Sequence, residues 1–142
     1  MKKQFILSVA LLSLSSICFA APLAIMNKAA ATKELSDKTI TTISAATLDG
    51  KVISDSFTGY FDKNGKMNGK FQTKPANDPQ TDQGSWIVKA DGKVCVTWQH
   101  WNSGKEKCVN FYRLSNALLI VNMNNGFESL VLNDDMQTGN KM

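Results

Sequence analysis

GSWIVKADGKVCVTWQHWNSGKEKCVNFYR, residues 84–113, carries the clearest structural signal in the chain. Apolar and polar residues alternate through three runs, 84–90, 93–101 and 106–115, as in strands with one buried face. Asp91-Gly92 separates the first two runs. This dipeptide favours a type I′ hairpin turn, because its residues tolerate the positive φ that the turn requires. We therefore expect antiparallel strands joined by short turns.

Alternation assigns the two faces of the hairpin formed by 93–101 and 106–115. The face that we expect to line the core carries Val94, Val96, Trp98 and His100 on the first strand, and Val109, Phe111 and Arg113 on the second. Cys95 and Cys108 fall on the opposite, more polar face. A disulfide between directly opposed cysteines would centre the turn near Trp101-Asn102. The composition of Asn102-Ser103-Gly104 places the turn slightly later, and we expect a bulge to reconcile the two.

Outside this hairpin, Asp49-Gly50, Asn64-Gly65 and Asn125-Gly126 mark three further turns. The eight predicted strands cover 39–48, 51–61, 66–73, 84–90, 93–101, 106–115, 117–124 and 127–133. Eight short strands in succession predict an all-β, mainly antiparallel, up-and-down meander that closes, or nearly closes, into a barrel. The alternative is a strongly bent open sheet capped by a short N-terminal helix.

The segments before, within and after the β domain, 39–133, that are not predicted strands differ from them in composition. Residues 21–38 form an Ala- and Lys-rich arm with a helix-compatible segment at 27–35. Residues 75–83 contain two prolines and are predicted to form a surface loop, and 134–142 to form a flexible tail.

Residues 1–20 are typical of a secretory signal peptide. Lys2 and Lys3 precede an apolar run that ends at a small-residue site before Ala21. This run is too short for a membrane span. Cleavage after Ala20 predicts a periplasmic or secreted protein of the Gram-negative export type, with no integral membrane span. We do not expect Cys18 to be lipidated, because Ile17 precedes it and lipoprotein processing requires a small residue at that position.

Charge points to no nucleic-acid partner. The formal net charge of +4 falls to +2 when Lys2 and Lys3 are removed with the signal peptide. The remaining lysines are scattered singly from Lys28 to Lys141, so they form no basic stripe.

Three segments in order resemble a family of small exported bacterial proteins of unknown function: Gly84-Ser85-Trp86, Asp91 to Cys95, and Lys107 to Arg113. Its pattern is a G-x-W strand, a D-G-x-x-C hairpin, and a second cysteine before a Y/F-R step. The resemblance continues more loosely upstream, through Glu34-Leu35, Lys38-Thr39 and Tyr60 to Gly65. It implies a secreted or periplasmic β domain with the same cysteine pair, and no particular activity.

The sequence contains few candidate residues for a catalytic or metal-binding site. Cys95 and Cys108 are the only cysteines after the signal peptide, and such a pair normally oxidises in an exported protein. A metal site would need further ligands, and a thiol nucleophile would need a base, but His100 is the sole histidine and is predicted to face away from both sulfurs. We expect no catalytic residue, metal or cofactor.

Five residues are candidate binding residues: Trp98, His100, Trp101, Tyr112 and Arg113. Residues 98–101 form either a stacking platform for a sugar or peptide, with Trp101 as the main contact, or a structural unit. In the structural unit Trp98 fills the core, Trp101 covers the hairpin end and His100 lies at a barrel rim. Arg113, the only arginine, would need a carboxylate partner if it points inward, and Asp55 and Glu128 are the candidates. An inward Arg113 can also bind an anionic ligand, whereas a rim position exposed to water is the more common arrangement.

Three functions follow from these observations. The first is a non-catalytic binding module that recognises a protein or glycan, in the envelope or outside the cell, through the hairpin end. The second is a lipocalin-type carrier of a small ligand, which requires an apolar cavity of roughly 300 Å³ or more. The third is a secreted enzyme or inhibitor.

Overall fold

The computed structural model describes residues 23–43, 45–46, 52–54, 56–72 and 80–142. The predicted signal peptide, the Asp49-Gly50 turn and most of the predicted 75–83 loop lie outside the described residues.

The described chain forms a nearly closed, barrel-like antiparallel sheet of nine strands, which confirms the predicted fold class. In spatial order they are β10 (Phe127–Leu132), β9 (Ala117–Asn122), β8 (Lys107–Arg113), β7 (Val94–Trp98), β6 (Thr81–Val88), β5 (Lys66–Phe71), β4 (Phe57–Phe61), β1 (Lys38–Thr41) and β11 (Met136–Thr138). The predicted strands 39–48 and 51–61 are each broken. Their facing parts pair apart from the main sheet as β2 (Ala45–Ala46) and β3 (Val52–Ser54).

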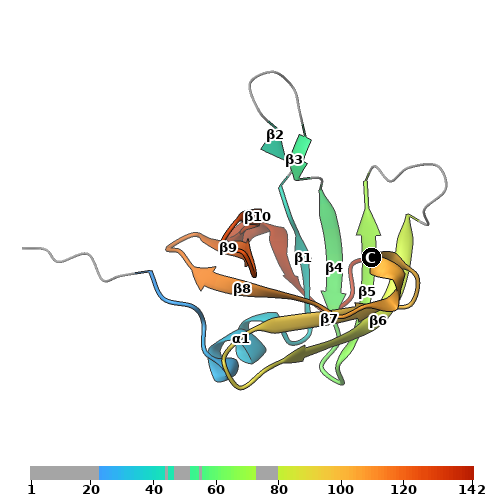
Figure 1. The fold of residues 1–142 in the computed structure, drawn as a ribbon, viewed down its shortest axis with the longest axis horizontal. Coiled ribbons are helices and arrows are strands. Elements are labelled where there is room, and N and C mark those ends of the chain that lie inside the picture. Colours follow the sequence, from blue (N-terminus) through green and yellow to red (C-terminus); the bar gives the residue numbers. More distant parts are fainter. Residues whose placement is uncertain (1–22, 44, 47–51, 55, 73–79) are drawn as a thin grey trace, which may run out of the picture.

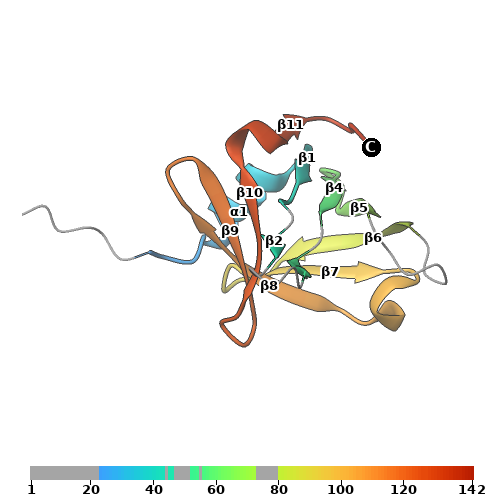
Figure 2. The ribbon, with the colours of Figure 1, turned by 90° about the horizontal axis from the view of Figure 1, so that it is seen from above.

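The sheet closes through a continuous piece of chain. Its two edge strands, β10 and β11, are consecutive in sequence and joined by the 3-10 turn η2 (Asn133–Asp135). Beside this connection, the Ile43 N–H donates to the carbonyl oxygen of Leu130 at 2.9 Å. Figures 1 and 2 show β9 and β10 curling back toward β1, so that the strands surround an interior.

The end of the chain is more ordered than the predicted flexible tail. β11 pairs with β1 in register, with Lys38 opposite Thr138. Beyond the strand, the Thr39 hydroxyl donates to the carbonyl oxygen of Gly139 at 2.7 Å. Three residues of an edge strand are too few for apolar alternation to reveal.

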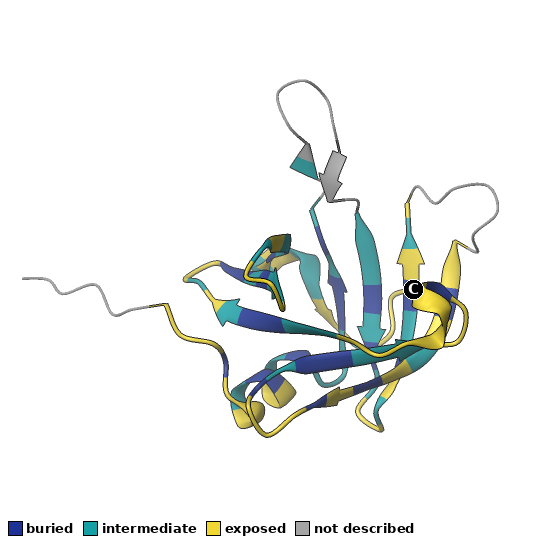
Figure 3. Cartoon of the chain, viewed as in Figure 1, coloured by how far each residue is buried: buried dark blue, intermediate teal, exposed yellow. Residues whose placement is uncertain are grey.

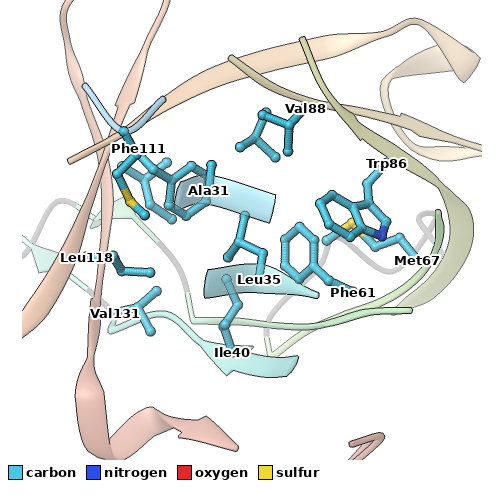
Figure 4. Close-up of a cluster of buried hydrophobic side chains, with 13 residues drawn as sticks. Ala31, Leu35, Ile40, Phe61, Met67, Trp86, Val88, Phe111, Leu118 and Val131 are labelled. Carbon is cyan, nitrogen blue, oxygen red and sulfur yellow. The ribbon is translucent and has the colours of Figure 1, made fainter. Parts of the chain in front are cut away.

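One helix, α1 (Lys28–Leu35), fills one end of the barrel, close to the predicted 27–35. Asn27 caps it by accepting the Ala30 N–H at 2.9 Å. Ala31 and Leu35 turn into the interior and are 0% and 1% exposed. In Figure 4, Leu35 lies next to both Ile40 and Phe61. Figure 3 shows buried positions along the strands and exposed ones at the hairpin ends. No helix in the described residues has the length and apolarity to cross a bilayer.

The described turns are at the predicted dipeptides but are not of type I′. Gly65 and Gly92 have φ of +82° and +87°, while Asn64 and Asp91 do not have positive φ. The N–H of each glycine donates to the carbonyl oxygen three residues earlier, at 3.0 Å. Each turn therefore places one left-handed residue last, as in a type I turn followed by a glycine bulge. At the third turn Asn125, with φ of 59°, takes that place.

Cys95 and Cys108 are directly opposed on β7 and β8 and form a disulfide, as predicted. Only Val94 to Val96 of β7 pair with β8, and their pairing shows no register shift. The expected bulge is therefore absent. A wide connection containing η1 (Trp101–Gly104) replaces it, in which Asn102 and Ser103 both have left-handed φ.

Candidate functional site

The half of the interior that α1 does not fill contains a cavity of about 320 Å³. Its wall is mostly apolar, and it is formed by inward-facing residues of β1, β4, β5, β7, β8, β9 and β10. The lining residues are Ile40, Thr42, Phe57, Phe61, Met67, Phe71, Val94, Val96, Trp98, Lys107, Val109, Phe111, Ile120, Phe127, Glu128 and Ser129.

Aromatic rings dominate this wall. Every phenylalanine in the described part of the chain lines the cavity, and Trp98 joins them. The phenylalanines come from four strands, at positions Phe57, Phe61, Phe71, Phe111 and Phe127. Such a wall offers a small ligand large apolar area and ring edges or faces for stacking.

Trp98 is held against the wall by neighbouring rings and a glycine. Its ring centroid lies 4.8 Å from that of Trp101 and 6.0 Å from that of Phe57. These rings need a residue without a side chain beneath them. A Cβ at Gly69 would lie 2.5 Å from Trp98 and 2.8 Å from Trp101. Gly69 therefore makes room for the cluster that fixes Trp98 at the cavity.

The polar part of the lining lies on β8, β10 and the end of β1. Lys107 Nζ on β8 pairs with Glu128 Oε1 on β10, two strands away in the sheet, and their side chains are 50% and 31% exposed. Thr42 and Ser129 also line the cavity, and both are buried. The Thr42 hydroxyl accepts the Phe57 N–H at 2.9 Å. The apolar cavity thus has a partly exposed ion pair at its edge.

Lys107 is not among the five predicted binding residues, although the sequence contains a signal for it. Lys107 has the same strand parity as Val109 and Phe111, so it belongs to the inward face of β8. A charged residue on a predicted core face is unusual. It therefore marks either a rim or a site.

Trp101 does not form the surface contact that the sequence suggested. It is 6% exposed and packs on Trp98, and its ring centroid lies 5.0 Å from that of Phe71. The η1 turn folds this indole inward, so the hairpin end does not offer it to a partner.

Asp82 on β6 anchors that turn. Its side chain is 1% exposed and accepts the N–H groups of His100 and Trp101, each at 2.8 Å. Burial would raise the pKa of this carboxyl, but hydrogen bonds from Trp101, His100 and Gln83 outweigh burial and hold the pKa below its ordinary value. The Asp82 oxygens are thus engaged in holding the turn.

His100 does not lie on the core face as expected. It follows the end of β7, with its side chain 68% exposed and Nδ1 3.0 Å from Asp82 Oδ1. Both residues line a second groove of about 480 Å³ over β5 and β6, whose other lining residues are Asn68, Gly69, Thr81, Gln83, Gln99 and Met142. The structure therefore separates His100 from Trp98.

Tyr112 and Arg113 lie at the helix end of the barrel. Tyr112 forms a backbone bridge with Ile25. Arg113 is exposed and its Nη1 lies 3.1 Å from Glu34 Oε1 on α1. Glu128, one expected partner of Arg113, instead pairs with Lys107, and Asp55 lies outside the described residues. Among the five predicted binding residues, only Trp98 lines the cavity.

In the described part of the chain, one cluster brings together three residues of metal-binding type. The donor atoms of Cys95, Glu106 and Cys108 lie within 4.8 Å of one another. Because the two sulfurs are bonded to each other, neither is a thiolate that a metal would require. This cluster is therefore a disulfide beside a carboxylate.

A scan of protein-family models and searches of curated proteins and of solved structures each find no match to this chain. The resemblance to small exported bacterial proteins therefore stays a prediction.

Proposed function

We propose that this protein is a non-catalytic binding protein that carries a small apolar ligand inside its barrel. The single observation that carries the proposal is the cavity of about 320 Å³, lined by all the phenylalanines of the described chain. Ligand pockets in proteins have volumes of roughly 300–1,000 Å³ and mostly apolar walls. The volume is at the small end of this range, so the ligand is small.

The apolar wall of this partly open cavity supports the proposal. At the helix end, α1 covers the inner face of the sheet, and Leu35 is 1% exposed. A ligand that covers the cavity wall would likewise remove apolar surface from water, which stabilises a complex by roughly 25 cal/mol per Å².

We further propose that the protein works after export, in the periplasm or outside the cell. The Cys95–Cys108 disulfide supports this compartment, because such bonds persist in oxidising environments. The signal-like residues 1–20 also support it.

Recognition of a protein or glycan by the hairpin end has less support. Its main aromatic contact would be Trp101, and this indole is buried. The remaining candidate there, His100, lies beside a shallow groove whose lining residues are mainly of polar type and include no aromatic ring besides its own imidazole. We therefore favour the interior over the hairpin end.

Binding of the uncharged fluorophore N-phenyl-1-naphthylamine to the oxidised chain, without residues 1–20, tests the proposal. Val96 lines the cavity, and Val96→Phe places a ring in it. The neighbouring Thr97 points to the other face of β7, so Thr97→Phe is the matched control. Val109→Phe blocks the cavity from β8 and serves if the first variant does not fold.

We expect the wild type and Thr97→Phe to enhance probe fluorescence equally, and a folded blocking variant to bind about tenfold more weakly or not at all. Near-ultraviolet circular dichroism confirms folding. Two results would overturn the proposal: a wild type that binds no probe up to its solubility limit, or folded blocking variants that bind like the wild type.

A further inference from the structure

The edge of the cavity has an unusual backbone feature that deepens the proposed function. Three consecutive residues, Phe127, Glu128 and Ser129, all line the cavity. In a regular strand, consecutive side chains point to opposite faces. The pairing of β10 with β9 shifts register between Phe127 and Ser129, and this bulge allows Glu128 to join its neighbours in the lining.

The bulge brings Glu128 to Lys107, which is two strands away in the sheet. A second lysine–glutamate pair, Lys89 and Glu106, lies 2.9 Å apart with both side chains about equally exposed, at 44% and 43%, and neither residue lines the cavity. Lys107 and Glu128 both line the cavity, and Glu128 is the less exposed partner. The inner pair is therefore placed to contact a ligand, and the outer pair is not.

The charge of this pair restricts the ligand. Lys107 attracts a ligand carboxylate, but Glu128 repels it. A ligand ammonium group is attracted by Glu128 and repelled by Lys107. An uncharged hydroxyl avoids both conflicts, because it accepts a hydrogen bond from Lys107 and donates one to Glu128. Among the residues that line the cavity, these are the only two with ionisable side chains, so the lining carries no net charge.

We propose, on the basis of the proposed function, that the ligand is a small aromatic molecule with one uncharged hydroxyl or amide group, which binds against the Lys107–Glu128 pair. The aromatic part follows from the ring-rich wall, because edge-to-face contacts favour aromatic ligands over saturated chains of equal area. The uncharged head follows from the balanced pair at the cavity's edge.

Displacement of N-phenyl-1-naphthylamine by naphthalene, 2-naphthol and 2-naphthoate at pH 7 tests this inference. The three competitors share one ring system and differ in the head: none, a hydroxyl or a carboxylate. We expect the wild type to bind 2-naphthol about tenfold more tightly than either of the others, as for a hydrogen bond to a charged group.

Two variants at the pair and one control locate the preference. Glu128→Gln removes the repelling carboxylate, and we expect 2-naphthoate to gain about tenfold in affinity. Lys107→Met leaves Glu128 unopposed, and 2-naphthoate should bind more weakly still. Glu106→Gln breaks the outer pair and should leave all three affinities unchanged.

The outcomes separate the two proposals. If the wild type binds all three competitors equally and Glu128→Gln changes nothing, the head-group inference is wrong and the apolar cavity stands. If the wild type prefers 2-naphthoate, the ligand is an anion and the inference is again wrong. If neither the probe nor naphthalene binds the wild type, the proposed function fails as well.

Discussion

The two ends of the barrel are formed by the same strands but differ in what fills them. At the helix end, Leu35 and Ala31 of α1 pack against Ile40, Phe61 and Phe111 in one buried cluster. At the other end, Val96 and Trp98 border a cavity of about 320 Å³. Figure 1 shows α1 on one side of the barrel and β2 and β3 projecting from the opposite side.

An apolar inner face does not by itself determine packing. Val94 and Val96 are two residues apart in one alternation on β7, and both line the cavity. Val94 is 0% exposed and belongs to the buried cluster, whereas Val96 is only half-buried and packs against that cluster.

The largest expected effect is at the helix end. Leu35→Ala should lower the free energy of unfolding by about 4 kcal/mol, because it leaves a void among fully buried neighbours. Lys33→Ala, an exposed change on the same helix, should stay within about 0.5 kcal/mol. Urea denaturation measures both. A loss below about 1 kcal/mol for Leu35→Ala would show that α1 is not an integral part of the core.

The next largest effect is at the pairing between β7 and β8. Replacing Cys95 and Cys108 with serine should cost about 3 kcal/mol, because the bond closes a loop with a sequence separation of 13 in the unfolded chain. Only three residues of β7 pair with β8, and the disulfide joins the middle pair. The disulfide is therefore a large part of the contact between these two strands. Equal denaturation midpoints for the oxidised wild type and the double variant would contradict this.

A smaller effect concerns the turn that places Trp101 behind the cavity wall. Asp82→Asn should cost about 2 kcal/mol, because a neutral amide is a weaker acceptor and faces N–H groups with its own donor. The pKa of Asp82 is lowered in the folded state. Its contribution is therefore complete above the unfolded pKa of about 4 and is lost as the pH falls through the folded value.

The stability gap between wild type and Asp82→Asn should therefore be constant from about pH 5 to 7 and shrink below about pH 4. Thermal melts across this range measure it. If this gap instead grew on acidification, the pKa of Asp82 would be raised in the folded state, contrary to our prediction.

The smallest effect on stability is at the open end. Phe127→Ala should change the free energy of unfolding by about 1 kcal/mol or less, because Phe127 is 45% exposed. The same variant should weaken binding of N-phenyl-1-naphthylamine, because Phe127 lines the cavity. A large loss of stability with unchanged binding would reverse the roles of the two ends.

Local signals predicted most of the sheet. The alternation in 84–113, the turn dipeptides and the cysteine pair placed the central strands, the turns and the disulfide register. The N-cap Asn27 and the apolar Ala31 and Leu35 are consistent with the predicted helix. Each of these features is determined by residues close in sequence or by direct strand pairing.

The missed features depend on contacts between distant residues. Trp101 is buried because Asp82, 19 residues earlier, binds the backbone of its turn. Glu128 reaches Lys107 through a bulge that has no distinctive composition, and they are 21 residues apart. The cavity depends on how deeply α1 enters the barrel, a property of volume that alternation does not encode.

The pairing of β1 with β11 also has a kinetic consequence. Lys38 pairs with Thr138 at a sequence separation of 100, and β11 is also one of the two edge strands that η2 joins. Contacts of such long range slow folding, because the loop must close before pairing stabilises it. While residues 136–138 are still being synthesised, the edge of β1 stays unpaired. Until then the barrel is an open sheet that a chaperone can bind and a protease can cleave.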